Sequence, residues 1–162
     1  MTRYRSTRAE IARLRAALDE SFMRESQIDS SWLTHKADYA SFLCIRVAGY
    51  LEKSVEAILV AHFRERAGGM IRSYGESTLT RPQNLSYERL LQTIGLFDLS
   101  LQREFGLFMA VNERKSTLNA LISYRNNLAH GESTGISIQR VNESLTVVQE
   151  VVVWLLNNFN SS

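Results

Sequence analysis

The stretch Ile122-Ser123-Tyr124-Arg125-Asn126-Asn127-Leu128-Ala129-His130-Gly131 ends a predicted helix around which the other elements can be arranged. Upstream of it, Leu118 and Leu121 recur at helical spacing with Ile122, and Arg125 projects within about 20° of Leu118. A guanidinium cannot be neutralised, so an arginine on this apolar face needs an anionic or hydrogen-bonding partner. We therefore predict a helix that holds Arg125 beside the core.

The end of this helix is predicted from Gly131. Glycine readily adopts the left-handed backbone conformation with which many helices stop. His130 then falls in the last turn or just beyond it, where the helix dipole favours a protonated imidazole. Each of these residues alone can have a purely structural role, because Asn, His and Gly are common at helix ends. Together, Arg125, the amides of Asn126 and Asn127, and His130 place a cation, two amides and a titratable base at one helix end.

The seven residues Arg125-Asn126-Asn127-Leu128-Ala129-His130-Gly131 resemble the Arg-Asn-(three residues)-His motif of the HEPN superfamily. HEPN domains are helical and include many metal-independent ribonucleases. The pattern RN-x-x-AHG is most similar to the RiboL-PSP and MAE-type HEPN branches of prokaryotic toxin and defence systems. Over the rest of the chain, the resemblance rests on the helix order and on a long preceding helix, residues 37–66, with Glu52 near its middle.

This resemblance implies both an activity and an assembly. It implies an endoribonuclease with Arg125, Asn126 and His130 as site residues and no cofactor, acting as a toxin or phage-defence effector. It also implies a homodimer in which two motifs share one cleft, with RNA as the substrate and a cognate antitoxin or other defence-system protein as a further partner. Some toxin branches carry Tyr two positions after the His, where this chain has Glu132. Regulation through that tyrosine is therefore left unsupported.

The residues themselves indicate cleavage without a metal. The chain has no HExxH, P-loop or GxSxG motif and no carboxylate cluster near the Arg-His motif, so two-metal hydrolysis has little support. Imidazoles titrate near neutral pH, so His130 can take the proton of an RNA 2′-hydroxyl or give one to the leaving 5′-oxygen. Arg125 can hold the phosphate and stabilise its growing charge, and Asn126 can orient His130 or donate to the same phosphate. One histidine is half of an acid–base pair, so we expect an isologous dimer to supply the other half.

Two other functions fit the same residues. A catalytically silent HEPN-like module would bind RNA, a nucleotide or a protein partner, because a fold alone does not determine activity. A dimeric scaffold would use Arg125 as a buried structural ion. The nuclease hypothesis requires both His130 side chains of a dimer to open into one positively lined, solvent-filled cleft, and this requirement separates the three alternatives.

Composition sets broad limits on these functions. The chain has 162 residues, 44% of them hydrophobic and 22% charged, as in ordinary globular proteins. Its net charge of +2 does not by itself demand a nucleic-acid partner. The single cysteine, Cys44, excludes an intramolecular disulfide, and its apolar neighbours predict that it is buried. With no signal sequence and no apolar run long enough to span a bilayer, we expect a cytoplasmic protein with no membrane contact.

Hydrophobic periodicity predicts an all-α fold: one domain over residues 1–162, built as an antiparallel bundle of about five helices. The first helix is expected to begin at Thr7, because Thr7 and Glu10 form a capping box. Residues 27–31 are expected to supply the N-cap of a long second helix over residues 32–67, where apolar residues follow near-heptad spacing.

Two polar residues of the long helix could be functional or purely structural. Glu52 lies beside the apolar stripe, where it either supports Arg125 or faces solvent. His62 lies on the apolar side, and we predict a hydrogen-bonded core histidine rather than a metal ligand.

Residues 68–85 are predicted to form a long, mobile loop. They include three glycines and the only proline, Pro82. Arg72, Tyr74 and Arg81 give the segment a basic and aromatic character suited to a nucleic-acid strand, although an ordinary surface loop is the simpler interpretation. After it, Ser86 is a predicted cap for one short helix, and Asp98 or Ser100 for the next.

The C-terminal segment has the most regular pattern in the chain. Its apolar residues step alternately by three and four, which no strand produces, and this outweighs the local strand preference of its valine runs. Additional apolar residues widen the stripe, so the helix should either lie at the centre of the bundle or have a second partner. The heptad positions are Ile138, Val141, Leu145, Val148, Val152, Leu155 and Phe159, and the widening residues are Val147, Val151 and Trp154.

Overall fold

The computed structural model describes residues 2–80 and 84–159, with side chains from residue 6 onward. These residues form helices and connecting turns without a strand, which confirms the predicted all-α class. Seven helices are present in this part of the chain, where about five were expected. They are α1 (Thr2–Ser26), α2 (Leu33–Arg66), α3 (Gly69–Leu79), α4 (Tyr87–Phe97), α5 (Leu99–Met109), α6 (Arg114–Ala129) and α7 (Ile138–Phe159).

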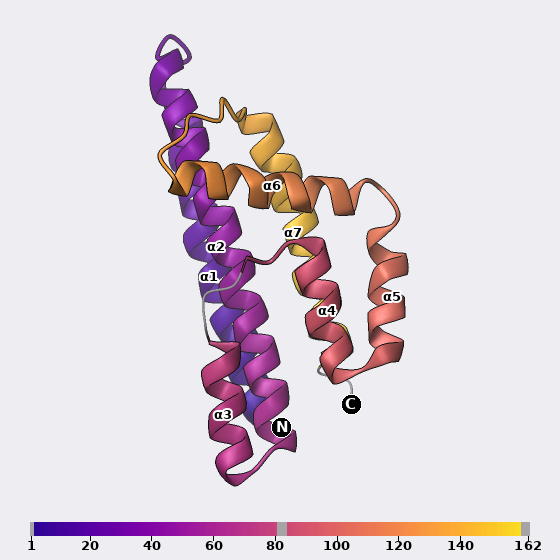
Figure 1. Cartoon of the computed structure of the whole chain (residues 1–162). Helices are drawn as coiled ribbons and strands as arrows, with labels where there is room; N and C mark the ends of the chain where they lie inside the picture. The colour runs from indigo at the N-terminus through magenta and orange to yellow at the C-terminus, as the bar shows by residue number, and fades with distance from the viewer. Residues whose placement is uncertain (1, 81–83, 160–162) are drawn as a thin grey trace.

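The long helix α2 is the centre of the arrangement (Figure 1). It packs against α1 and α7 on different sides, and α6 crosses it near its N-terminal half. The shorter α3 covers only the C-terminal half of α2, while α4 and α5 form a hairpin at the side of the bundle. Every other helix is therefore positioned directly or indirectly by α2.

The core lies mainly between α2 and α7. Apolar side chains of both helices are removed from solvent, and burying one aliphatic side chain contributes about 1.5–3 kcal/mol relative to leaving it exposed. Within the described residues, no helix is long and apolar enough to cross a membrane. The fully buried core residues of the two helices include Leu43, Val47, Leu51, Ile58, Val148, Val152 and Leu155.

The α7 heptad is confirmed, and so is its wide apolar surface. Val151 is fully buried, and Trp154 packs against two rings of α5, with its ring centroid 5.1 Å from that of Phe105 and 5.9 Å from that of Phe108. The helix therefore contacts α2 and α6 as well as the aromatic side chains of α5. Of the two alternatives that the sequence left open, a central position in the bundle or a second partner, these contacts show the central position.

The predicted start of α1 and the predicted N-cap of α2 are wrong. Helix α1 begins at Thr2, so Thr7 is a buried residue inside the helix rather than an N-cap. No Gly or Pro precedes Thr7 to stop the helix, which therefore extends past the predicted capping box. The N-cap of α2 is Trp32, without a side-chain hydrogen bond. Asp29 instead accepts from the Ser31 N–H at 2.8 Å and closes the turn before it.

The predicted loop over residues 68–85 is also wrong, because α3 occupies Gly69–Leu79. Interactions with α2 compensate for the weak helix propensity of this segment. A Cβ on Gly75 would lie 2.1 Å from Phe63 Cε1, so the glycine allows α3 to approach α2 closely. Arg64 and Arg72 each contact Glu76, at 2.9 and 2.8 Å. The other predicted loop residues, Arg81 and Pro82, lie outside the described residues.

The roles predicted for the two helix caps and for the core histidine are confirmed. Ser86 caps α4 by accepting from the Arg89 N–H at 3.3 Å, and Asp98 rather than Ser100 caps α5. His62 is a core histidine whose Nδ1–H donates to the Phe159 carbonyl at 3.0 Å.

Cys44 is fully buried, as the sequence predicted. Burial raises the pKa of its thiol to about 11, so it is not a reactive nucleophile.

Candidate functional site

The motif helix α6 is anchored at its start by Arg114. The Arg114 Nε atom contacts Glu150 of α7 at 2.6 Å, and Nη1 donates to the Phe108 carbonyl at 3.0 Å. Only 13% of the Arg114 side chain is exposed. Together with a buried apolar face, this anchor determines where the other end of α6 lies. The buried residues of that face are Leu118, Leu121 and Ile122.

The C-terminal end of α6 has the predicted glycine stop. His130 is the C-cap, and Gly131 follows in left-handed backbone with φ of 79°. The Gly131 N–H donates to the Leu128 carbonyl at 3.1 Å. The Glu132 N–H donates to the Asn127 carbonyl at 2.9 Å. These two bonds form a Schellman motif, which fixes the backbone of His130 and leaves its side chain exposed to solvent.

Arg125 has an acidic partner from the long helix. Its Nη2 atom lies 3.4 Å from Glu52 Oε1, which resolves the question that the sequence left open about Glu52. The side chains of Arg125 and Glu52 are 34% and 24% exposed, so the pair lies at the border between core and solvent. The contact uses one guanidinium nitrogen rather than the two-pronged geometry that saturates an arginine. Arg125 therefore keeps donors with which it can bind a further anion.

Asn126 contacts Arg125 rather than the histidine. Its Oδ1 atom accepts from Arg125 Nη1 at 3.3 Å, a contact that the sequence did not predict. In the described part of the chain, the His130 ring makes no hydrogen bond with Asn126 or with any other residue. The structure thus places Arg125 between Glu52 and Asn126 and presents His130 separately at the helix end.

Glu52 is held in its position against an electrostatic cost. Burial raises the pKa of its carboxyl group, and the attraction of Arg125 and Lys53 only partly opposes that effect. A carboxylate kept in a partly desolvated place beside a cation is a common feature of functional sites. We therefore include Glu52 with Arg125, Asn126 and His130 in the candidate site.

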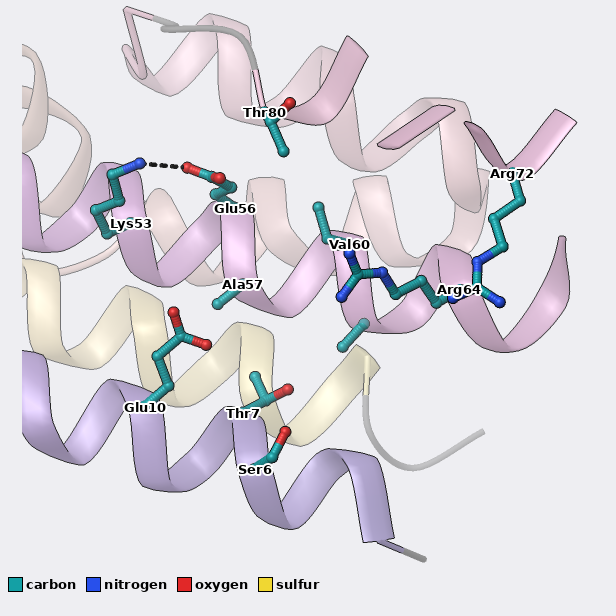
Figure 2. Close-up of a pocket in the computed structure, with 11 residues that line it drawn as sticks. Ser6, Thr7, Glu10, Lys53, Glu56, Ala57, Val60, Arg64, Arg72 and Thr80 are labelled. Carbon is teal, nitrogen blue, oxygen red and sulfur yellow. Dashed lines mark hydrogen bonds and ion pairs between the residues drawn. The ribbon is translucent and has the colours of Figure 1, made fainter. Parts of the chain in front are cut away.

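A separate cleft lies between α1, α2 and α3 (Figure 2). Its cations are already paired, Lys53 with Glu56 at 2.8 Å and both Arg64 and Arg72 with Glu76. The two arginines lower the pKa of Glu76 to about 2. None of the residues lining this cleft belongs to the motif, and its charges are balanced within the chain. It is therefore a weaker candidate for anion binding than the end of α6.

Among the described residues, no group of three or more His, Cys, Asp and Glu side chains is arranged to hold a metal ion.

The geometry defines a helical bundle that presents an arginine, an asparagine and a histidine at the end of one helix. A family model described as RiboL-PSP-HEPN matches residues 24–155, which cover most of the chain and include the whole motif. The chain therefore belongs to the RiboL-PSP-HEPN family, and an RNase-like or RNA-binding role follows at the level of the family. No curated protein and no solved structure matches the chain.

Proposed function

We propose that the protein is a metal-independent endoribonuclease that cuts RNA through the RNA's own 2′-hydroxyl, as a homodimer in a toxin or phage-defence system. One observation carries the proposal: the end of α6 presents an exposed His130 five residues after Arg125, which lies 3.4 Å from Glu52. A fixed cation and a solvent-accessible imidazole are the two groups that metal-free RNA cleavage requires.

In this mechanism, one His130 takes the proton of the 2′-hydroxyl. The 2′-oxygen forms a bond to phosphorus while the bond from phosphorus to the 5′-oxygen breaks. The second His130 gives a proton to that 5′-oxygen, so the products are a 2′,3′-cyclic phosphate and a free 5′-hydroxyl. Arg125 donates to the non-bridging oxygens, whose negative charge increases in the transition state.

Two copies of the chain are needed because each supplies one imidazole. General acid and general base must be present at the same phosphate, and each proton transfer contributes about 10²–10⁴-fold in rate. A two-fold symmetric dimer brings identical groups to one axis and completes the pair.

The direct test is incubation of purified protein with total RNA, with and without EDTA, followed by analysis of the product ends. We expect cleavage that survives EDTA, 2′,3′-cyclic phosphate ends, and intact single-stranded DNA, since DNA lacks the 2′-hydroxyl. Loss of activity in EDTA, or equal cleavage of DNA, would contradict this mechanism.

Variants separate catalysis from binding. His130→Ala should fold, bind RNA and cut it about 10²–10⁴-fold more slowly, because it loses only a proton-transfer group. His35→Ala, which changes another exposed histidine, should cut at the parent rate. RNA that is bound but left uncut by the parent protein would instead support the catalytically silent binding module.

Mixed dimers test the shared site. If both histidines are needed, adding excess His130→Ala protein under exchange conditions should suppress parent activity more than dilution does. Suppression no greater than dilution would mean that each chain works alone.

A further inference from the structure

Gly49 is a glycine inside the longest helix, and no packing contact within the described part of the chain requires it. Glycine in a helix interior destabilises the helix by about 1 kcal/mol relative to alanine. Apart from the backbone of its own helical turn, a Cβ built on Gly49 would have no described atom within 4 Å, so the space beside it is open. Gly75 is different, because a Cβ there would overlap the Phe63 ring. The glycine at position 49 therefore points to a close approach by something outside this chain.

The side chains next to Gly49 on α2 are apolar and exposed. Phe42 is 44% exposed and Ile45 is 46% exposed. With Gly49 they follow a spacing of three and four, so they share one face of the helix. We call Phe42, Ile45 and Gly49 the Gly49 surface. Its next position along the helix, three residues on, is Glu52, which contacts Arg125.

We propose that the Gly49 surface is where a second copy of this chain docks, with the two α2 helices crossing at Gly49. The inference rests on the proposed function, because one chain supplies one imidazole and the site is incomplete without its partner. A two-fold contact through this surface places each copy's Glu52–Arg125 pair beside the interface, and so brings the two α6 ends together. Without a side chain at Gly49, the two backbones can approach closely.

The chemistry of the surface favours a protein copy over RNA. Phe42 and Ile45 themselves offer no donors to phosphate, and charges of both signs border them: Glu52, Lys53, and Arg46, whose Cζ atom lies 6.0 Å from the Phe42 ring centroid. Apolar side chains rimmed by charged ones are typical of protein interfaces. RNA would instead meet the arginines and histidines of the two motifs beside this contact.

Disruption of the surface is the first test. Ile45→Lys should weaken dimerisation by about tenfold or more in Kd, measured by sedimentation equilibrium, because it places a charge in the contact. Val153→Lys is the matched control, since Val153 is 54% exposed on α7, and it should leave Kd unchanged. A parent chain that stays monomeric, or an Ile45→Lys dimer as tight as the parent, would overturn the inference.

Cross-linking locates the contact independently. Cys44 is buried, so Ile45→Cys adds the only accessible thiol in the described residues and leaves Gly49 free of a side chain. A short bismaleimide should link two Ile45→Cys chains several-fold faster than two Leu107→Cys chains, whose thiols would lie on the exposed side of α5. Equal linking of the two variants would place the contact elsewhere.

The failure of this inference can be told apart from failure of the proposed function. Oligomeric state tests only the surface, and RNA cleavage tests only the shared site. If Ile45→Lys is a monomer but still cuts RNA at the parent rate, the Gly49 surface is supported as the dimer contact and the shared catalytic site is contradicted. If Ile45→Lys still forms a dimer as tight as the parent, the Gly49 surface is contradicted as the dimer contact, whatever the activity of the variant.

Discussion

The C-terminal half and the middle of α2 differ in what covers the side of the helix that faces away from the core. Along the C-terminal half, α3 lies on the helix, and Gly75 lets the two backbones approach because a Cβ would overlap Phe63. At the middle of α2, the same kind of residue, Gly49, faces open space. One glycine is explained by a contact within the chain, and the other is not. A glycine inside a helix thus locates an interface only after the packing around it is known.

The largest expected effect is a change in the free energy of unfolding, which compares a buried residue of α2 with an exposed one. Leu51→Ala should lower the free energy of unfolding by about 2–5 kcal/mol, because Leu51 is fully buried and its truncation leaves a cavity. Ile45→Ala should change it by less than about 0.5 kcal/mol in dilute protein, since Ile45 is half exposed.

Denaturant unfolding at several protein concentrations makes the measurement. The Leu51→Ala loss should not depend on concentration, whereas the Ile45→Ala loss should grow where the chain associates. A concentration-independent Ile45→Ala loss as large as that of Leu51→Ala would contradict the assignment of Ile45 to a free surface.

The two glycines should respond with opposite signs. Gly75→Ala should cost about 1–3 kcal/mol, because the new methyl group displaces the Phe63 ring. Gly49→Ala should stabilise dilute protein by about 0.5–1 kcal/mol, since the helix gains propensity and meets no clash. The double variant Gly75→Ala, Phe63→Leu should recover part of the first loss. Destabilisation by Gly49→Ala in dilute protein would mean that its surroundings are not open.

Local sequence patterns predicted the strongly periodic parts of this fold. The heptad of α7, the extent of α2 and the glycine stop after His130 all follow from residue spacing and backbone preference, and all are found. The start of α1 and the existence of α3 could not be predicted in the same way. Helix α3 depends on contacts made by Gly75 and Glu76 with distant residues of α2, and propensity contains no information about those contacts.

The candidate site was predicted in part for the same reason. Arg125, Asn126 and His130 come from one continuous motif, so the sequence could place them at one helix end. The partner of Arg125 comes from α2, and helical periodicity left Glu52 at the edge between the core and solvent. Only the crossing of α2 and α6 decides that Glu52 faces Arg125.

A smaller effect concerns the pH dependence of stability, which should differ between His62 at the covered C-terminal end of α2 and His35 at its exposed start. Burial lowers the pKa of His62, and the nearby Arg66 adds to that effect. The unfolded chain therefore binds a proton near pH 6.5, the ordinary histidine value, where the folded chain does not. Stability contributed by neutral His62 is lost as pH falls below that value. His62→Gln should flatten the decline of Tm between about pH 7.5 and 5.5, whereas the exposed His35→Gln should not. If Tm declines with pH equally steeply in the two variants, protonation of His62 is not the cause of that decline.

The smallest expected change in stability comes from Glu52→Gln, beside the Gly49 surface. Because burial raises the pKa of Glu52 despite Arg125, its contribution to stability is present below the ordinary pKa of 4.5 and is lost as pH rises through the folded value. At neutral pH the ionised side chain therefore gives no net stabilisation, and Glu52→Gln should keep the parent Tm or exceed it slightly.

Activity should respond differently from stability in the same variant. Without the carboxylate, Arg125 loses the partner that holds it at the end of α6, so Glu52→Gln should cut RNA more slowly even though it is as stable as the parent. Glu52→Asp, which keeps the charge, should recover part of the rate. Glu56→Gln, one turn further along α2 and paired with Lys53, should leave the rate unchanged. A Glu52→Gln protein that melts well below the parent at neutral pH would show that the Arg125 attraction outweighs burial. Glu52 would then be part of what holds α6 on α2, rather than a residue kept to position Arg125.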